Sequence, residues 1–126
     1  MKLVLDTGAL IALERDDRRM WRLLGHANKD GMSAVTHGGV VGQAWRRGGP
    51  RQALLARALR AIDVRPLDEA LGREAGRLLA ETRRSDVIDA AIVLLTQDDD
   101  VLVTSDPDDL APLAEAAGRT IEIIVL

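Results

Sequence analysis

The sequence predicts a three-layer α/β/α fold in which helices cover both faces of a central parallel sheet. Short apolar segments typical of strands alternate along the chain with longer segments whose apolar residues recur at helical spacing. The chain has 126 residues, enough for one domain with a substantial core and too few for two. No repeat, linker or low-complexity segment interrupts it, so we expect a single domain over residues 1–126.

The first half of the chain opens with a strand that runs directly into a helix. Residues 3–5 form a short apolar run typical of a buried parallel strand, and Asp6 ends it. Residues 9–13 then continue as a buried helix. The elements expected next are a helix over 20–25 that closes at Gly25, a weak strand over 32–35, a helix over 40–45 stopped by 48–50, a helix that starts at Pro50, and a strand over 62–66.

The second half contains the most apolar helix of the chain. Residues 87–95 are apolar on several sides, which predicts a central position, and Ser85 is its expected cap. We expect Asp98, Asp99 and Asp100 to form an exposed turn. The other expected elements are an amphipathic helix over 67–79, a strand over 101–104, a helix from Pro107 to Gly118, and a β-branched strand over 120–126.

Composition excludes several classes of function. The chain has no cysteine, so it can form neither disulfides nor thiolate metal sites. Trp21 and Trp45 are the only aromatic residues, too few for a base-stacking surface. The net charge of −3 argues against a protein that coats nucleic acid, so any such contact must be local. We find no membrane span and no signal-peptide cleavage pattern, and we expect a cytoplasmic protein.

Acidic residues stand where predicted strands end and helices begin. Asp6 follows the first strand and Asp106 follows the strand over 101–104, and ligands bind at such strand ends in open α/β sheets. Asp89 lies on the apolar helix, with Asp86 three residues earlier on the same face. Each of these acids could instead serve only as a helix cap or a partner of a helix dipole. His26 and His37 lack metal-ligand spacing, and we expect both on the surface or in loops.

Asp89 is the acid that a capping role explains least well. It is flanked by apolar residues, and a buried carboxylate without a partner is costly. A divalent cation shared with Asp6 and Asp106 would compensate its charge, and oxygen ligands of this kind suit Mg²⁺ or Mn²⁺. Such a site would suit hydrolysis of a phosphodiester. The residues expected to assist are Thr7, Thr104 and Ser105 through their hydroxyls, and Arg46 and Arg47 through contacts to a nucleic-acid backbone.

Three segments taken together resemble a known family. They are Leu-Asp-Thr-Gly-Ala-Leu-Ile-Ala at 5–12, Asp-Val-Ile-Asp-Ala-Ala-Ile-Val at 86–93, and Val-Thr-Ser-Asp-Pro-Asp-Asp-Leu at 103–110. In order and spacing they resemble a PIN domain, and more narrowly a VapC-type toxin of type II toxin–antitoxin systems. The resemblance spans essentially the whole chain.

The resemblance implies an Mg²⁺- or Mn²⁺-dependent endoribonuclease, usually a homodimer, that a cognate antitoxin inhibits. It implies that Asp6, Asp89 and Asp106 are the catalytic and metal-binding acids, with Asp86 and Asp109 as accessory acids. The family usually has a glutamate on the helix after the second strand, where this chain has Gln43. A carboxamide oxygen can accept a hydrogen bond or approach a cation but brings no charge, so we expect a lower metal affinity.

Two other interpretations remain open from the sequence. Residues 5–9 also resemble the active-site loop of the small dimeric aspartic proteases, whose fold is nearly all β and which would leave Asp89 and Asp106 unexplained. Alternatively, the chain is a catalytically weakened binding module with the same fold, in which the acids act only as helix caps.

Overall fold

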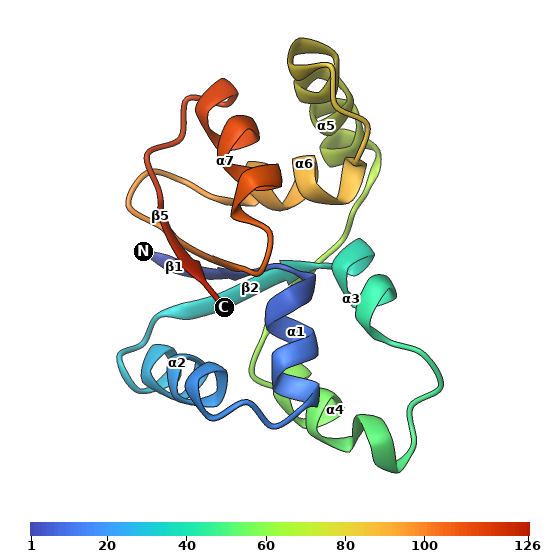
Figure 1. Ribbon diagram of the computed structural model, residues 1–126, viewed down its shortest axis with the longest axis vertical. Helices are drawn as coiled ribbons and strands as arrows, with labels where there is room; N and C mark the ends of the chain where they lie inside the picture. The colour runs from blue at the N-terminus through green and yellow to red at the C-terminus, as the bar shows by residue number, and fades with distance from the viewer.

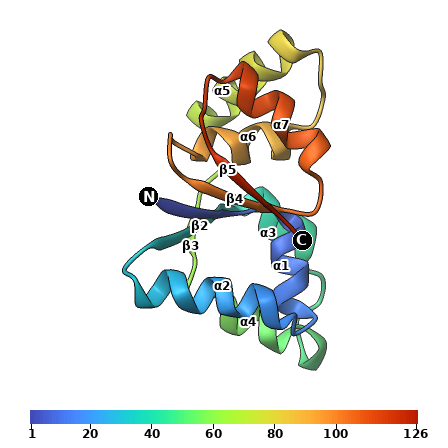
Figure 2. The same cartoon turned by 60° about the vertical axis from the view of Figure 1, so that its left-hand side comes forward.

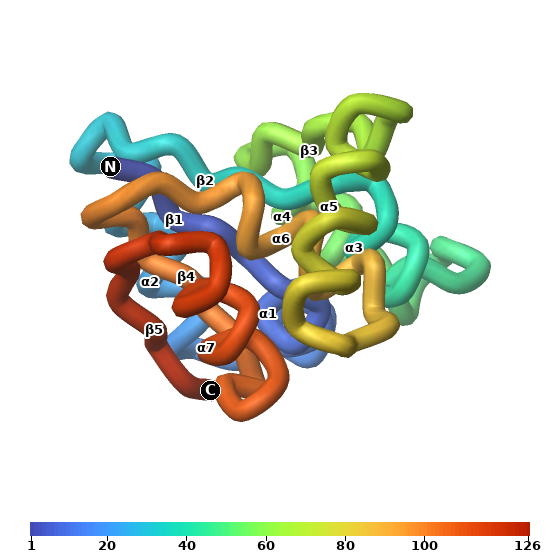
Figure 3. The backbone as a smooth tube through the Cα atoms, turned by 90° about the horizontal axis from the view of Figure 1, so that it is seen from above, coloured from blue at the N-terminus to red at the C-terminus, as the bar shows by residue number.

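The computed structural model describes residues 1–126 and contains one five-stranded sheet. The strands are β1 (Lys2–Leu5), β2 (Ser33–His37), β3 (Asp63–Arg65), β4 (Val101–Thr104) and β5 (Glu122–Val125). Their order across the sheet is β3-β2-β1-β4-β5 (Figure 3). Every neighbouring pair of strands is parallel. In the register of the three central strands, Val4 lies between Val35 of β2 and Leu102 of β4.

Helices cover both faces of this sheet, as the alternating pattern predicted. On one side lie α1 (Thr7–Glu14), α2 (Arg18–Lys29) and α4 (Ala53–Leu59), and on the other lie α5 (Glu69–Thr82), α6 (Val87–Leu95) and α7 (Pro107–Ala116) (Figures 1 and 2). The short helix α3 (Gly38–Ala44) follows β2 and packs on α1, and the single 3₁₀ turn η1 (Pro50–Gln52) leads into α4. None of the helices combines the length and the apolar character needed to cross a bilayer. The expected three-layer α/β/α arrangement is confirmed.

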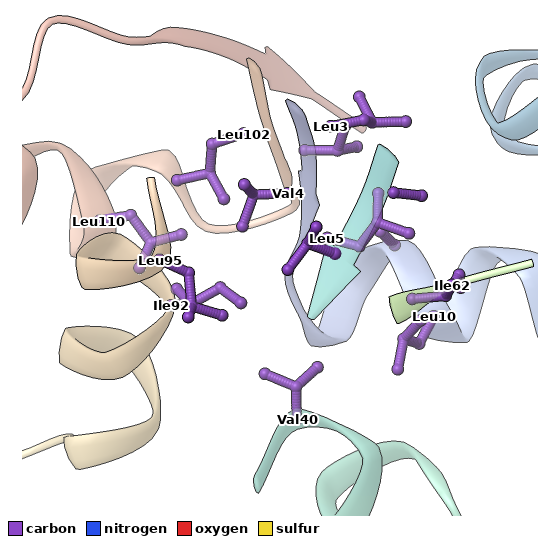
Figure 4. Close-up of a cluster of buried hydrophobic side chains, with 14 of the residues drawn as sticks. Leu3, Val4, Leu5, Leu10, Val40, Ile62, Ile92, Leu95, Leu102 and Leu110 are labelled. Atoms are coloured by element: carbon purple, nitrogen blue, oxygen red, sulfur yellow. The ribbon is translucent and has the colours of Figure 1, made fainter. Parts of the chain in front are cut away.

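The core forms where β1 lies between the two helical layers. Val4 and Leu5 are completely buried and belong to one continuous cluster of 29 buried apolar residues. Figure 4 shows Val4 beside Ile92 of α6 and Leu110 of α7. The alanines at 90 and 91 are also fully buried, so α6 approaches the sheet closely and brings the residues of its first turn near the end of β1.

Three local expectations were wrong. The second helix does not close at Gly25 but continues to Lys29, because its apolar face continues through Ala27, which is buried. Asp86, rather than Ser85, caps α6: its carboxylate accepts hydrogen bonds from the backbone N–H groups of residues 88 and 89. Asp100 is not part of an exposed turn, since it is 1% exposed and pairs with Lys2 at 2.8 Å.

Candidate functional site

The order of the strands reverses between β1 and β4, so the carboxyl ends of these two strands are the expected ligand-binding edge of the sheet. The chain adds β2 and β3 on one side of β1 and then crosses back to add β4 and β5 on the other side. Ligands of open α/β sheets usually bind where the strand order reverses in this way. Asp6 follows β1 directly, and its backbone N–H donates to the carbonyl of Val103 at 3.1 Å. Asp106 follows β4 and precedes α7. The two acids therefore come to the same edge of the sheet.

The capping interpretation fails for both of these acids. Asp6 and Asp106 occupy the N-cap positions of α1 and α7, yet neither side chain makes an N-cap hydrogen bond to its helix. Asp86 is different, because its carboxylate does cap α6, at 2.9 Å from the nitrogen of Ile88. Two of the predicted catalytic carboxylates are thus not used in holding their helices.

Asp6 is the most buried acid of the site, with 4% of its surface exposed. Its Oδ2 accepts a hydrogen bond from the Thr104 hydroxyl at 3.0 Å, and that hydroxyl oxygen accepts from the backbone N–H of Asp106 at 2.9 Å. Burial raises the pKa of the Asp6 carboxyl, and the charges of Asp106 and Asp86 raise it further, against the hydrogen bonds from Thr7 and Thr104. Thr104 therefore links the Asp6 carboxylate to the backbone of Asp106.

Asp89 lies in the first turn of α6 and is half-buried. Its pKa is raised from the ordinary value of 3.8 to about 7. Burial is the largest cause, followed by repulsion from the carboxylates of four other acids, which in decreasing order are Asp86, Asp6, Asp109 and Asp106. The other four acids predicted for the site therefore all lie close enough to Asp89 to raise its pKa. We call the five acids, Asp6, Asp86, Asp89, Asp106 and Asp109, the acid cluster.

Basic side chains compensate little of this charge. The structure contains four ion pairs, and only the one between Arg84 and Asp109, at 3.8 Å, involves the acid cluster. Arg84 and Asp109 lie on the wall of a hollow of about 240 Å³ whose other lining residues are Ser85, Asp86, Asp89 and Leu113. Sequence reasoning missed Arg84, although its place two residues before Asp86 put it next to the predicted site.

The donor set fits a hard divalent cation in its chemistry. Every predicted ligand is a carboxylate oxygen, which Mg²⁺ and Mn²⁺ prefer. No three of the chain's Asp, Glu and His side chains are arranged so that they alone could hold a metal ion. Mg²⁺ in proteins usually keeps several of its waters and binds through one or two carboxylates together with substrate phosphate. Direct coordination by Asp6, Asp89 and Asp106 together stays a prediction.

The other predicted site residues differ in what they contact. The Thr7 hydroxyl donates a hydrogen bond to Oε1 of Gln43, so the residue in place of the usual glutamate reaches the start of α1. Ser105 packs so closely on Gly8 that a Cβ there would lie 2.3 Å from its Oγ, which gives Gly8 a packing role. Arg46 and Arg47 are exposed and lie beyond the end of α3, away from the acid cluster.

His37 was expected on the surface, and that expectation was wrong. It ends β2 and is fully buried. Its Nδ1 accepts from the backbone N–H of Gly39 at 3.0 Å, and its Nε2 donates to the carbonyl of Ile88, also at 3.0 Å. Burial lowers its pKa, in keeping with this neutral form. The imidazole thus ties β2 and α3 to the first turn of α6, one residue before Asp89, and only its place after an apolar strand hinted at this.

Comparison with known proteins supports the fold and does not test the chemistry of the site. No protein-family model matches the chain, and no curated protein matches it in sequence. Among solved structures it is similar to a chain of VapBC2 from Rickettsia felis, determined bound to a DNA fragment from their promoter. The two chains are 13% identical, with a TM-score of 0.71, and the match covers 98% of this chain and 99% of the other. The expected three-layer α/β/α, PIN-like fold is therefore confirmed. The aspartic-protease alternative is wrong because the sheet is parallel and covered by helices.

Proposed function

We propose that this protein is the toxin of a toxin–antitoxin pair and cleaves RNA internally with the help of Mg²⁺ or Mn²⁺. The observation that carries the proposal is the acid cluster at the switch point of the sheet, where Asp6 and Asp89 have raised pKa values and no basic partner. Crowded carboxylates of this kind gain most from a divalent cation. The VapC-type fold agrees with a toxin.

The chain's own residues have separate parts in this proposal. Asp6, Asp89 and Asp106 would hold the cation, which when bound polarises a phosphodiester and activates water. Thr104 orients the Asp6 carboxylate, and the hydroxyl of Thr7, the residue after Asp6, holds the Gln43 carboxamide at the start of α1. Asp86 holds the first turn of α6, and Arg84 with Asp109 borders the hollow through which RNA would approach.

A cleavage assay tests the proposal. Purified protein should cut single-stranded RNA internally when Mg²⁺ or Mn²⁺ is present, and a chelator should stop the reaction. Asp6→Asn and Asp106→Asn should abolish cleavage while leaving the circular dichroism spectrum unchanged, because neither side chain caps its helix. Asp16→Asn, which changes an exposed aspartate in the turn after α1, is the matched control and should keep full activity. Wild-type turnover in either site variant would contradict the assignment.

The proposed partners follow from the same assignment. The structurally similar chain belongs to VapBC2. We propose that this protein has a cognate antitoxin, forms a homodimer and acts on cytoplasmic RNA. Co-expression with the product of a small neighbouring reading frame should yield a complex that no longer cleaves RNA. Size-exclusion chromatography with light scattering of the free protein tests the dimer, and a monomer at all concentrations would contradict it.

A second candidate is a binding module with weakened or no catalysis. Gln43 in place of a glutamate and the absence of a preformed three-ligand group favour it. Thermal unfolding with increasing Mn²⁺ separates the two functions, because a ligand that binds only the native state raises its stability. A rise that disappears in Asp89→Asn supports the nuclease, whereas no rise at millimolar Mn²⁺ supports the module.

A further inference from the structure

A second charged hollow lies outside the acid cluster, where the loop after α3 packs on the end of α1. It has a volume of about 390 Å³ and is lined by Arg46, Arg47, Gly48, Arg51, Gln52 and Glu14. We call it the arginine pocket. Three guanidinium groups gathered at one place stand out in a chain whose net charge is −3. The pocket therefore carries a local excess of positive charge.

One buried side chain gives the arginine pocket a fixed shape. Gln52 is 5% exposed, and its Oε1 accepts from the backbone N–H groups of Arg46 at 3.0 Å and Gly48 at 2.8 Å. Its Nε2 donates to the carbonyl of Ala44 at 3.0 Å and to Glu14 at 2.9 Å. A satisfied buried amide of this kind rigidifies the segments it joins. The loop is thus held in place without any ligand.

The arginines of the pocket have no acidic partners within the chain. None of the four ion pairs includes Arg46, Arg47 or Arg51. The Arg46 guanidinium donates instead to the carbonyls of Gly42 and Trp45, at 3.2 and 2.9 Å, which fixes its orientation. Like charges held close together repel, and an anion that bridges them removes the repulsion. Planar guanidinium groups match the paired oxygens of a phosphate especially well.

The position of the pocket connects it to the acid cluster. Asp6 precedes α1 and Glu14 is its last residue, so α1 runs from the acids to the pocket. A helix of eight residues is about 12 Å long. The last turn of α3 also spans the two regions, since Gln43 contacts Thr7 and Arg46 follows three residues later. One extended polymer can therefore reach both places.

We propose that the arginine pocket binds backbone phosphates of the RNA strand whose scissile bond lies at the acid cluster. The inference rests on the proposed function, because it takes the polymer cut at the acids to be RNA. Phosphate contacts fix the position of a strand without reading its bases. The pocket therefore sets where along the strand the acid cluster acts and how tightly the strand is held.

The test measures binding of a fluorescent single-stranded uridine oligoribonucleotide in the presence of a chelator, so that nothing is cut. The double variant Arg47→Gln/Arg51→Gln leaves the hydrogen bonds of Arg46 in place. Its Kd should rise about tenfold, and the slope of log K against log salt should fall by about 0.7 for each phosphate that the variant no longer neutralises. The control Arg18→Gln/Arg22→Gln removes the same charge from exposed positions on α2 and should leave the slope unchanged.

The outcomes separate this inference from the proposed function. An unchanged slope in the double variant, or an equal fall in the control, overturns the inference. So does a polyglutamate peptide that binds the wild-type pocket when RNA does not, because that result assigns the pocket to an acidic protein. If the pocket variant loses RNA binding but wild-type protein with Mg²⁺ or Mn²⁺ cuts no RNA, the proposed cleavage fails and the RNA-binding pocket stands. If the wild-type protein cleaves RNA but the double variant binds RNA with unchanged Kd and salt slope, the role of the arginine pocket is refuted and the proposed cleavage stands.

Discussion

Replacing Asp89 by asparagine should stabilise the metal-free protein at pH 8 and have little effect on its stability at pH 3. The folded state raises the pKa of this carboxyl to about 7, from 3.8, through burial and the repulsion of neighbouring carboxylates. Between these two values the folded protein holds a proton that the unfolded chain releases, so the free energy of unfolding falls as the pH rises. Above pH 7 the full cost is present, and asparagine removes it.

The magnitude follows from the shift in the Asp89 pKa. One pKa unit corresponds to about 1.4 kcal/mol, which sets an upper bound of about 4 kcal/mol on the destabilisation. Asp89 is only half-buried, so solvent screening reduces the expected gain to about 1–2 kcal/mol. For a chain of this length that corresponds to a rise in Tm of about 3–10 °C.

The assay is thermal unfolding in a chelator at a series of pH values, with Asp16→Asn as the control. Asp16 is exposed in a left-handed turn that asparagine also tolerates, so this variant removes a carboxylate away from the acid cluster. The difference between Asp89→Asn and wild type should grow from pH 4 to pH 7 and then level off, while the control shows no such growth. A variant of Asp89 that is less stable than wild type at pH 8, or equally shifted at every pH, would refute the crowding of charge at this site.

Three further predictions test other contacts. Gln43→Glu adds a carboxylate next to Thr7, so it should lower the Tm in a chelator. The same variant should bind Mn²⁺ about tenfold more tightly in the thermal-shift titration. An unchanged metal affinity would place residue 43 outside the ion's reach. Lys2→Met leaves the buried Asp100 without its cation and should cost about 1–3 kcal/mol in urea at pH 7. The cost should disappear as the pH falls through the lowered pKa of Asp100, and a cost that persists at pH 2 would argue for packing instead. His37→Phe removes the hydrogen bonds to the backbone N–H of Gly39 and the carbonyl of Ile88 and should cost about 1–3 kcal/mol by urea unfolding. No cost would mean that water replaces the imidazole at both groups.

The order of elements and the acid positions could be predicted because both depend on local patterns. Apolar strands of three to five residues followed by helical spacing specify a parallel sheet, and the carboxyl ends of such strands must meet at one edge. Asp6 and Asp106 follow β1 and β4 on this basis, and Asp89 comes near them because α6 packs against the sheet through its alanines.

What the sequence could not reveal depends on contacts between distant segments. The buried positions of His37 and Asp100 follow from partners 51 and 98 residues away, which no local spacing encodes. Ser85 and Asp86 are both favourable N-cap residues, so only the backbone geometry decides that Asp86 caps α6. The arginine pocket likewise depends on Gln52, a polar residue that composition alone places on the surface.

The electrostatics of the acid cluster argue that these carboxylates are arranged for a ligand rather than for stability. The helices α1, α6 and α7 all begin there, and each helix N-terminus contributes about half a positive charge that favours anions. Those fields lower carboxyl pKa values, yet the pKa values of Asp6 and Asp89 are still raised. Burial and the mutual repulsion of the carboxylates act in the opposite direction. A fold selected for stability alone would have little reason to gather repelling carboxylates around a buried Asp6 and a half-buried Asp89. A cation brought in with an RNA phosphate would supply the missing charge.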